Sequence, residues 1–435
     1  MILWIILGTS FTKWHPSLVL LTAALFLGAL LQIPPLIILK LIKEGFGKIV
    51  ENIGLLILFG TIIGFILERS QATLSIANWV LKHLNMLPLP YCISCIGYLV
   101  SIPVFCDAAF VILSQLNKTI SRQTKTPLVG LSVALSTGLF APHALIPPTP
   151  GPLAAAANLN LDNLILLIAV GGVIAFILIL VGGAYGNYLI KKNHQTQAEK
   201  DSNEISQSEL SEDLPSFTSA ILPILIPILL MCFGGALNFL PNDTLSISYL
   251  RFITSPTTAL GVGMLFAFRL VNSKKGSFIY KSISNGIYQA APILIITSMG
   301  GALGTIIQTI PLQEYAIGIT SFESLGIIIP FAIAALLKTA QGSSTVAIIT
   351  ASSIVFPLLP LMDLESEMGK VWTIMAIGVG SMTVSHANDS YFWIVSQMSD
   401  MNVKTAYRTH TLGTFFQGVV GLVVVFIGHS LWKIF

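Results

Sequence analysis

Apolar runs follow one another along most of the chain, separated by short polar stretches. A membrane-spanning helix requires roughly 20 predominantly apolar residues. Ten runs are candidates, the first of them short: 2–12, 16–34, 52–67, 126–158, 162–190, 216–240, 250–270, 289–308, 368–398 and 411–432. We therefore predict ten crossings. The runs 126–158 and 368–398 are long and are broken near their middle by Gly, Pro or polar residues.

Two further apolar stretches carry a polar interruption between half-length apolar arms. The stretch 88–117 is interrupted at Cys106-Asp107, and the stretch 325–360 is interrupted between Lys338 and Ser344. Arms of this length are too short to cross a bilayer, and irregular backbone inside a membrane must line a cavity or be covered by protein. We therefore predict two re-entrant hairpins.

The segment 191–215 is polar and rich in Ser, Glu and Gln. It predicts a flexible linker between an N-terminal membrane repeat, 1–190, and a C-terminal membrane repeat, 216–435. The two halves resemble each other at an offset of 240, which lays Gly60 and Gly64 on Gly300 and Gly304. Because five crossings in each half is an odd number, the second half must insert upside down. The predicted fold is an all-α polytopic membrane protein of two inverted-topology repeats.

Composition supports a membrane protein and excludes several other classes. Hydrophobic residues make up 54% of the 435 and charged residues 9%, against about 25% charged in soluble proteins. The net charge of +3, with no basic stripe between aromatics, argues against a nucleic-acid partner. The four cysteines lie in apolar surroundings and are interpreted as small buried hydrophobes. We expect no metal and no cofactor.

The basic residues predict an orientation. If 191–215 is cytoplasmic, 15 Lys and Arg residues lie inside and 6 outside, with Lys338 within the membrane. This asymmetry agrees with the positive-inside rule, and it places both chain ends in the periplasm. The chain opens with no basic residue before its first apolar run and no small-residue cleavage pattern, so that run is interpreted as a span and not as a removed signal peptide.

Five ionisable residues fall on the four interruptions: Asp107, His143, Lys338, His386 and Asp389. An ionisable residue at the bilayer centre costs roughly 3 kcal/mol, so each requires a reason. The aspartates are proton acceptors or helix caps. The lysine neutralises an anionic substrate, pairs with one of the aspartates, or reaches an interface. The histidines relay protons, donate to substrate hydroxyls, or bond freed carbonyls.

Backbone at two of the breaks favours an anion. Four prolines within 147–152 prevent a helix there, and Gly342 precedes two serines that suit a helix start. The N–H groups after Gly151 and Gly342 would then begin half-helices whose ends attract a carboxylate. The candidate substrate-binding residues are His143, Thr149, Gly151, Lys338, Gln341, Gly342, Ser343, Ser344, His386 and Asn388, and the candidate proton-coupling residues are Asp107 and Asp389.

Three motifs carry a resemblance to a known family. They are PPTPGP at 147–152, AQGSSTVAIIT at 340–350 and SHANDSYFW at 385–393. With them, nearly the whole chain resembles the gluconate:proton symporter family of the ion transporter superfamily. Many members have His where this chain has Thr149, and Arg where it has Lys338.

The resemblance implies a multi-pass protein of a bacterial inner membrane, which takes up a sugar acid or small hydroxycarboxylate together with protons. It also implies a homodimer in which a transport domain moves against a fixed scaffold, as in an elevator.

Other functions stay open at this point. Sodium is an alternative coupling ion, with freed carbonyls around Gly342 and His386 as ligands. An intramembrane hydrolase would also place aspartates, serines and histidines in the membrane, but GxGD, GxSxG and HExxH motifs are missing from the sequence. A channel would require rings of like charge or a repeated carbonyl filter. We expect a transporter and not an enzyme.

The orientation can be tested with a single cysteine. A Ser206→Cys variant should resist a membrane-impermeant thiol reagent in intact cells and react after permeabilisation, because the positive-inside rule places 191–215 in the cytoplasm. Ready labelling in intact cells would reverse the predicted orientation.

Overall fold

The computed structural model describes residues 14–84, 86–194, 214–237, 245–271, 276–307, 326–387 and 389–434, together with Trp4, Leu7, Gly8, Thr309 and Ile310. All regular secondary structure in these residues is helical. The predicted span 2–12 and most of the predicted linker 191–215 lie outside the described residues.

Helices of the first half are α2 (Pro16–Leu30), α3 (Pro35–Arg69), α4 (Ala72–His83), α5 (Leu89–Ser101), α6 (Cys106–Thr124), α7 (Leu128–Leu145), α8 (Pro150–Asn158) and α9 (Leu164–His194). Helices of the second half are α10 (Phe217–Leu237), α11 (Leu245–Thr254), α12 (Pro256–Phe268), α13 (Gly276–Ile307), α16 (Ile328–Gln341), α17 (Ser344–Val355), η2 (Phe356–Met362), α18 (Glu367–Met382), α19 (Ser390–Met398), α20 (Val403–Ala406), η3 (Tyr407–Thr411) and α21 (Leu412–Ile434).

Six described segments are long and apolar enough to cross a membrane, judged by length and composition. They are Pro35–Arg69, Leu128–Asn158, Leu164–Lys192, Phe278–Ile307, Ser344–Met362 and Val403–Lys433. The apolar pattern placed three boundaries wrongly. The run 289–308 is the second part of α13, which begins at Gly276. The run 52–67 is the second part of the 35-residue helix α3, whose first part carries charged residues. The run 250–270 is two helices, because Ser255 ends α11 and caps α12 by accepting a hydrogen bond from the Thr258 N–H.

Four helix breaks occur in the interrupted segments. They separate α5 from α6 at 102–105, α7 from α8 at 146–149, α16 from α17 at 342–343, and α18 from α19 at 383–389. Local chemistry explains two of them. Pro147 and Pro148 cannot continue α7, and Gly342 has a φ of 83°, in the left-handed region that glycine adopts most readily. The first break ends just before Cys106-Asp107, so Asp107 lies in the first turn of α6.

Helices of the first half recur in the second half about 240 residues later. The starts of α2, α3, α5 and α8 at 16, 35, 89 and 150 correspond to those of α12, α13, α16 and α19 at 256, 276, 328 and 390. The ends of α8 and α19 match in detail. Asn160 and Asp400 are both left-handed, and the next N–H bonds back to Ala156 in one case and to Ser396 in the other, each at 2.8 Å.

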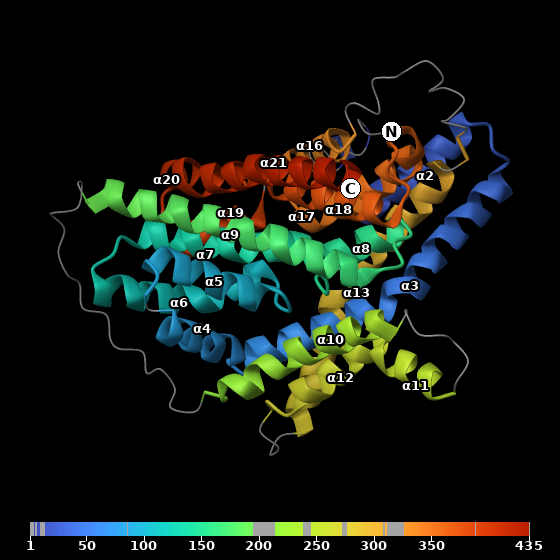
Figure 1. Ribbon diagram of the computed structural model, residues 1–435. Coiled ribbons are helices and arrows are strands. Elements are labelled where there is room, and N and C mark those ends of the chain that lie inside the picture. Colours follow the sequence, from blue (N-terminus) through green and yellow to red (C-terminus); the bar gives the residue numbers. More distant parts are fainter. Residues whose placement is uncertain are drawn as a thin grey trace.

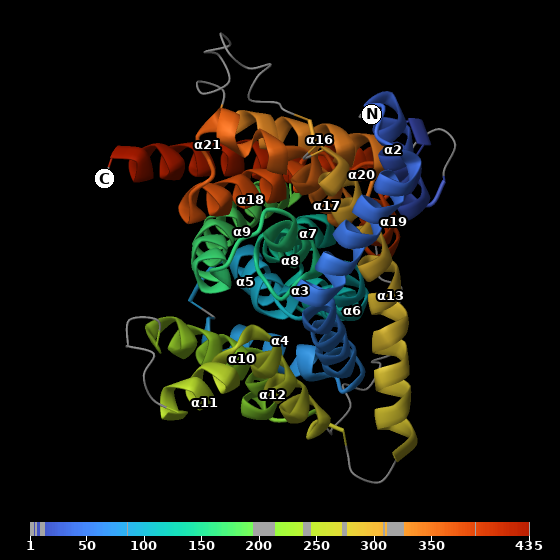
Figure 2. The ribbon, with the colours of Figure 1, turned by 90° about the vertical axis from the view of Figure 1, so that its right-hand side faces the viewer.

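The helices form a central body, made of α5–α9 and α16–α21, beside a frame, made of α3 and α13. Figures 1 and 2 show α5–α9 and α16–α21 stacked together, with α10, α11 and α12 at the other end of the molecule, next to α4. Helices α3 and α13 pack along each other at the side of the central body (Figure 2). The central body contains all four breaks, whereas α3 and α13 are continuous over more than 30 residues each.

Helices α3 and α13 are antiparallel and approach closely. Gly45 meets Gly301, while Ile62 meets Gly286 further along the pair. A Cβ on Gly45 would lie 2.6 Å from the Gly301 carbonyl oxygen and 2.9 Å from the Ala302 Cα. Small residues let membrane helices pack at this distance, so Gly45 is required for the frame.

Two glycines on the same helix test this contact. A Gly45→Ala variant should melt at a lower temperature in detergent, with a loss of about 1 to 3 kcal/mol, because the new methyl group meets backbone atoms. The matched Gly47→Ala variant meets nothing within 4 Å and should be neutral or slightly stabilising. Equal melting temperatures for the two variants would contradict the close approach.

Candidate functional site

Three of the four breaks open onto one cavity of about 350 Å³, named here the central cavity. Its lining comes from the starts of α6, α17 and α19, from α7, and from α13 of the frame. The lining residues are Phe105, Cys106, Asp107, Ala108, Phe140, His143, Gln289, Ile293, Ser343, Ser344, Thr345, Asp389, Ser390 and Tyr391. Because helix N-termini carry unpaired N–H groups and partial positive charge, the three helix starts favour an anionic ligand.

Lys338 and Asp389 form a buried ion pair beside this cavity. The Lys338 Nζ lies 2.5 Å from the Asp389 Oδ2, and the two side chains are 1% and 4% exposed. The ammonium also donates to the Gly342 carbonyl at 2.5 Å and lies 5.5 Å from the centre of the Phe140 ring. The lysine therefore joins the break between α16 and α17 to the break between α18 and α19.

A chain of buried side chains continues from Asp389 into the central body. The Ser385 hydroxyl donates to Asp389 Oδ2 at 2.5 Å and lies 3.1 Å from His410 Nε2. The other ring nitrogen of His410 lies 3.1 Å from the Ser136 hydroxyl. All four of these residues are buried. Asp389 also caps α19 by accepting from the Tyr391 N–H at 3.1 Å. Every oxygen of this carboxylate thus has a partner within the protein.

Asp107 has a different environment. It lines the central cavity, the Ser390 hydroxyl donates to its Oδ2 at 3.3 Å, and the Cys106 thiol donates to its Oδ1 at 3.5 Å. Among the described residues it forms no ion pair. Asp107 is therefore the carboxylate of the central cavity that no lysine or arginine of the described residues neutralises.

The structure brings together part of the predicted set in the cavity wall. His143, Ser343 and Ser344 line it with the two aspartates, and Lys338 reaches Asp389 from behind. The Ser343 hydroxyl caps α17 by accepting from the Val346 N–H at 3.3 Å.

The other predicted residues lie outside the lining. Thr149 donates to the Ile146 carbonyl at 2.5 Å and lines a small neighbouring cavity with His143, while Gly151 packs against Ile348. Gln341 is part-buried, and neither polar atom of its amide has a hydrogen-bond partner. His386 Nε2 lies 3.1 Å from the Thr339 carbonyl oxygen, and Asn388 lies outside the described residues.

Sequence reasoning missed many residues of the site. In the cavity wall these are Phe105, Cys106, Ala108, Phe140, Gln289, Ile293, Thr345, Ser390 and Tyr391, most of them neighbours of predicted residues. Gln289 and Ile293 lie in an apolar helix whose pattern gives no sign of a cavity, and they line the site because α13 packs beside α17. His410 and Ser385 extend the network behind Asp389. A signal existed for Ser385, which belongs to the SHANDSYFW motif, and for His410, an ionisable residue next to an apolar run.

Comparison with known proteins gives one family and several relatives. Residues 1–431 match the GntP family permeases. An uncharacterised permease of Haemophilus influenzae is 31% identical, with 90% of this chain and 83% of that protein aligned. The D-serine transporter DsdX of Escherichia coli is 29% identical over 95% and 93% of the two chains, and a gluconate permease of Pseudomonas aeruginosa is 28% identical over 97% and 94%.

A solved structure has the same fold. The YdaH transporter of Alcanivorax borkumensis superimposes with a TM-score of 0.67 at 13% identity, over 96% of this chain and 99% of that one.

The buried ion pair can be tested with a double-mutant cycle. Lys338→Met and Asp389→Asn should each destabilise the protein by about 3 to 5 kcal/mol, because each removes one partner and leaves a buried polar or charged group unpaired. The double variant should recover much of that loss when melting is followed in detergent. Lys433→Met, which breaks the exposed pair with Asp363, should change stability by less than about 1 kcal/mol. Additive losses in the double variant would show that the two groups do not interact.

Proposed function

We propose that this chain, which belongs to the GntP family of permeases, takes up a small hydroxylated carboxylate, such as a sugar acid, together with a proton. Membership of the family makes it a multi-pass secondary transporter of a bacterial membrane and not an enzyme. The observation that carries this proposal is the central cavity, where three helix starts and several hydroxyl groups surround one carboxylate that has no cation partner among the described residues.

The lining of the cavity supports this substrate class. The N–H groups at the start of α17 suit the substrate's carboxylate, and Ser344, Thr345 and Gln289 supply partners for its hydroxyls. Gluconate and D-serine, the substrates named for two relatives, both combine a carboxylate with at least one hydroxyl group. In this proposal His143 and Ser343 complete the binding wall. Lys338, Gln341 and Gly342 belong to the break between α16 and α17. Thr149, Gly151, His386 and Asn388 stay candidates for substrate binding.

Asp107 is the proposed proton carrier. Asp389 is less suited, because both of its carboxylate oxygens already accept from partners within the protein, namely Lys338, Ser385 and the Tyr391 N–H. An anion that entered alone would move against an inside-negative potential, at about 2.3 kcal/mol per charge per 100 mV. Protonation of Asp107 on the outside and release inside would remove that penalty. Sodium is less well supported, because the Gly342 carbonyl, expected among its ligands, accepts from Lys338.

Alternating access is proposed to use the internal duplication. Helix order and the matched ends of α8 and α19 support two inverted-topology repeats, 1–190 and 216–435, joined by a cytoplasmic linker at 191–215. The helix pairs α5–α6 and α16–α17 would be re-entrant hairpins, and α7–α8 and α18–α19 the broken helices. The central body would move as an elevator against α3 and α13, in a homodimer of the kind that the family resemblance implies.

Substituting the two aspartates separates coupling from binding. Asp107→Asn should abolish accumulation of substrate driven by a pH gradient while retaining substrate exchange, because a neutral amide copies the protonated carboxyl but cannot release a proton. Asp389→Asn should impair both activities, since it leaves Lys338 uncompensated. Asp363→Asn, at an exposed position, is the matched control and should behave as the unsubstituted protein.

Both activities would be measured in proteoliposomes with radiolabelled gluconate, after a thermal-shift screen of hydroxy and sugar acids. A ligand at 100 times its Kd stabilises the protein by about 2.7 kcal/mol. Full accumulation by Asp107→Asn, or an absolute need for sodium, would refute the coupling proposal.

A further inference from the structure

The charged groups around the central cavity do not balance. Among the described residues, its wall contains two carboxylates, Asp107 and Asp389, and no lysine or arginine. Lys338 lies behind the wall and neutralises Asp389 alone. The site therefore carries one net negative charge whenever Asp107 is ionised. An anionic substrate would then meet a like charge in a confined space, and this repulsion opposes its binding.

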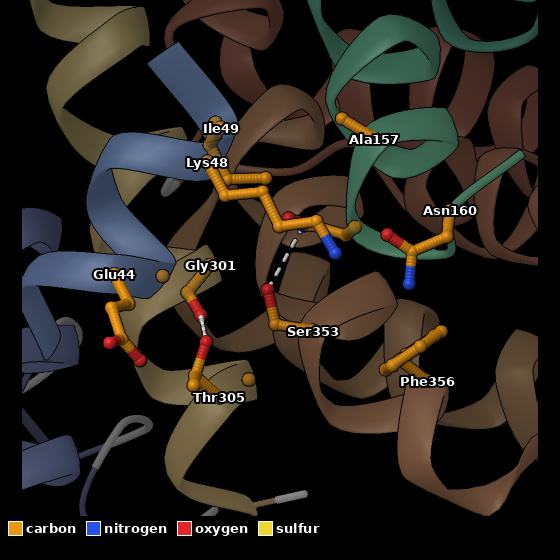
Figure 3. A pocket seen from close by; sticks show the side chains of 12 residues that line it. Glu44, Lys48, Ile49, Ala157, Asn160, Gly301, Thr305, Ser353 and Phe356 are labelled. Carbon is orange, nitrogen blue, oxygen red and sulfur yellow. Dashed lines mark hydrogen bonds between the residues drawn. The ribbon is translucent and has the colours of Figure 1, made fainter. Parts of the chain in front are cut away.

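A second polar cavity, of about 200 Å³, differs in this respect. It lies between α3, α13 and the ends of α8 and α17, and Glu44 and Lys48 of α3 both line it (Figure 3). These two residues have opposite charges and both are exposed, so water solvates them and no charged ligand is required. Asp107, in contrast, is part-buried, and its carboxylate receives only the Ser390 hydroxyl at 3.3 Å and the Cys106 thiol at 3.5 Å.

The start of α17 gives the central cavity a positive end opposite in character to Asp107. The Ser343 hydroxyl accepts from the Val346 N–H, which leaves the N–H groups of Ser344 and Thr345 at the start of the helix for a ligand. The cavity, about 350 Å³, falls within the range of about 300 to 1,000 Å³ that is usual for small-molecule sites. A molecule with a carboxylate at one end and an ammonium group at the other would find an opposite charge at both ends.

An unpartnered histidine in the same wall indicates that a polar ligand belongs there. His143 lines the central cavity and is 5% exposed, and its Nδ1 has no hydrogen-bond partner among the described residues. Buried polar atoms nearly always have such a partner. A hydroxyl group of the ligand, bonded directly or through a water molecule, would supply it.

We propose that Asp107 selects the class of substrate by its charge, and that its ionised form binds the ammonium group of a small hydroxylated amino acid. The substrate carboxylate binds at the start of α17, and the ammonium group takes the place of the proton on Asp107. The same cavity then accepts a hydroxy acid with a proton, or a hydroxylated amino acid without one. The inference rests on the proposed function, which places the substrate in this cavity, and adds a second substrate class with a different coupling.

The charge of the loaded site explains how both classes can be carried. A hydroxy acid brings one negative charge to a neutral, protonated Asp107. A zwitterionic amino acid brings no net charge to an ionised Asp107. The loaded site therefore has one net negative charge in both cases, the same as the empty site with Asp107 ionised. Only the hydroxy acid carries a proton with it, so only its accumulation draws on a pH gradient.

The first test compares glycerate with serine, which differ only in a hydroxyl or an ammonium group at the α carbon. In purified protein, Asp107→Asn should raise the Kd of serine at least about tenfold, because a charge-assisted contact is lost. It should leave the Kd of glycerate unchanged or lower it, because the amide copies the protonated carboxyl. Both enantiomers of each ligand would be titrated by calorimetry.

The matched control is Glu44→Gln, which removes an exposed carboxylate outside the central cavity and should leave both dissociation constants unchanged. Serine that binds Asp107→Asn as tightly as the unsubstituted protein would overturn the proposal. An equal loss of affinity for serine and glycerate, in a variant whose melting temperature without ligand is unchanged, would also overturn it.

The second test uses the unsubstituted protein and does not depend on the folding of a variant. In sodium-free proteoliposomes with an acidic exterior, radiolabelled glycerate should accumulate and acidify the interior. Serine should only reach equal concentrations on the two sides, with no acidification. Accumulation of serine driven by the pH gradient would overturn the proposal.

The two ligands also separate the failure of this inference from that of the proposed function. Accumulation of glycerate without entry of serine overturns the inference and leaves the proposed function intact. Entry of serine without transport of glycerate or gluconate overturns the proposed substrate class and leaves the ammonium site at Asp107 intact. Transport of none of the three overturns both.

Discussion

A helix that stops inside an apolar body leaves backbone N–H and C=O groups without partners, and this constraint shapes the centre of the molecule. Side chains, some of them from distant helices, form hydrogen bonds with these backbone groups. Ser343 and Asp389 cap the helices that restart, and the Ser385 N–H and carbonyl are bonded by the hydroxyls of Thr414 and Thr411. Grouping the breaks in one region satisfies the backbone and leaves helix starts facing a common space.

Asp389 combines three roles at this point: it caps α19, neutralises Lys338 and accepts from Ser385. A carboxylate with so many partners is a fixed part of the structure. Asp107 begins a helix in the same wall but has weak donors and no cation among the described residues. The two aspartates look equivalent in the sequence and differ in the fold, because one is held by a buried lysine and the other faces the central cavity without an ion pair among the described residues.

The sequence predicted the features that local chemistry determines. The proline run and Gly342 identified two of the breaks, although only Pro147 and Pro148 lie in the first of these and α8 already begins at Pro150. Three motifs identified the family that the match over residues 1–431 confirms. It failed where tertiary contacts decide. Charges at 40–51 concealed the first part of α3, because they lie on a helix that is long enough to carry them on an exposed face. The choice of Asp389 as the partner of Lys338, and the entry of Gln289 into the cavity wall, depend on how α13 and α16–α19 pack.

Entry of a hydroxylated carboxylate together with a proton would acidify the space that the substrate enters. It is tested most directly by recording the internal pH of sodium-free proteoliposomes with a trapped pH-sensitive dye while gluconate is added outside. Proton symport predicts acidification of the interior that requires both the substrate and the protein and that is lost in Asp107→Asn. Saturable uptake of the substrate with no change in internal pH, or uptake that begins only when sodium is supplied, would contradict it.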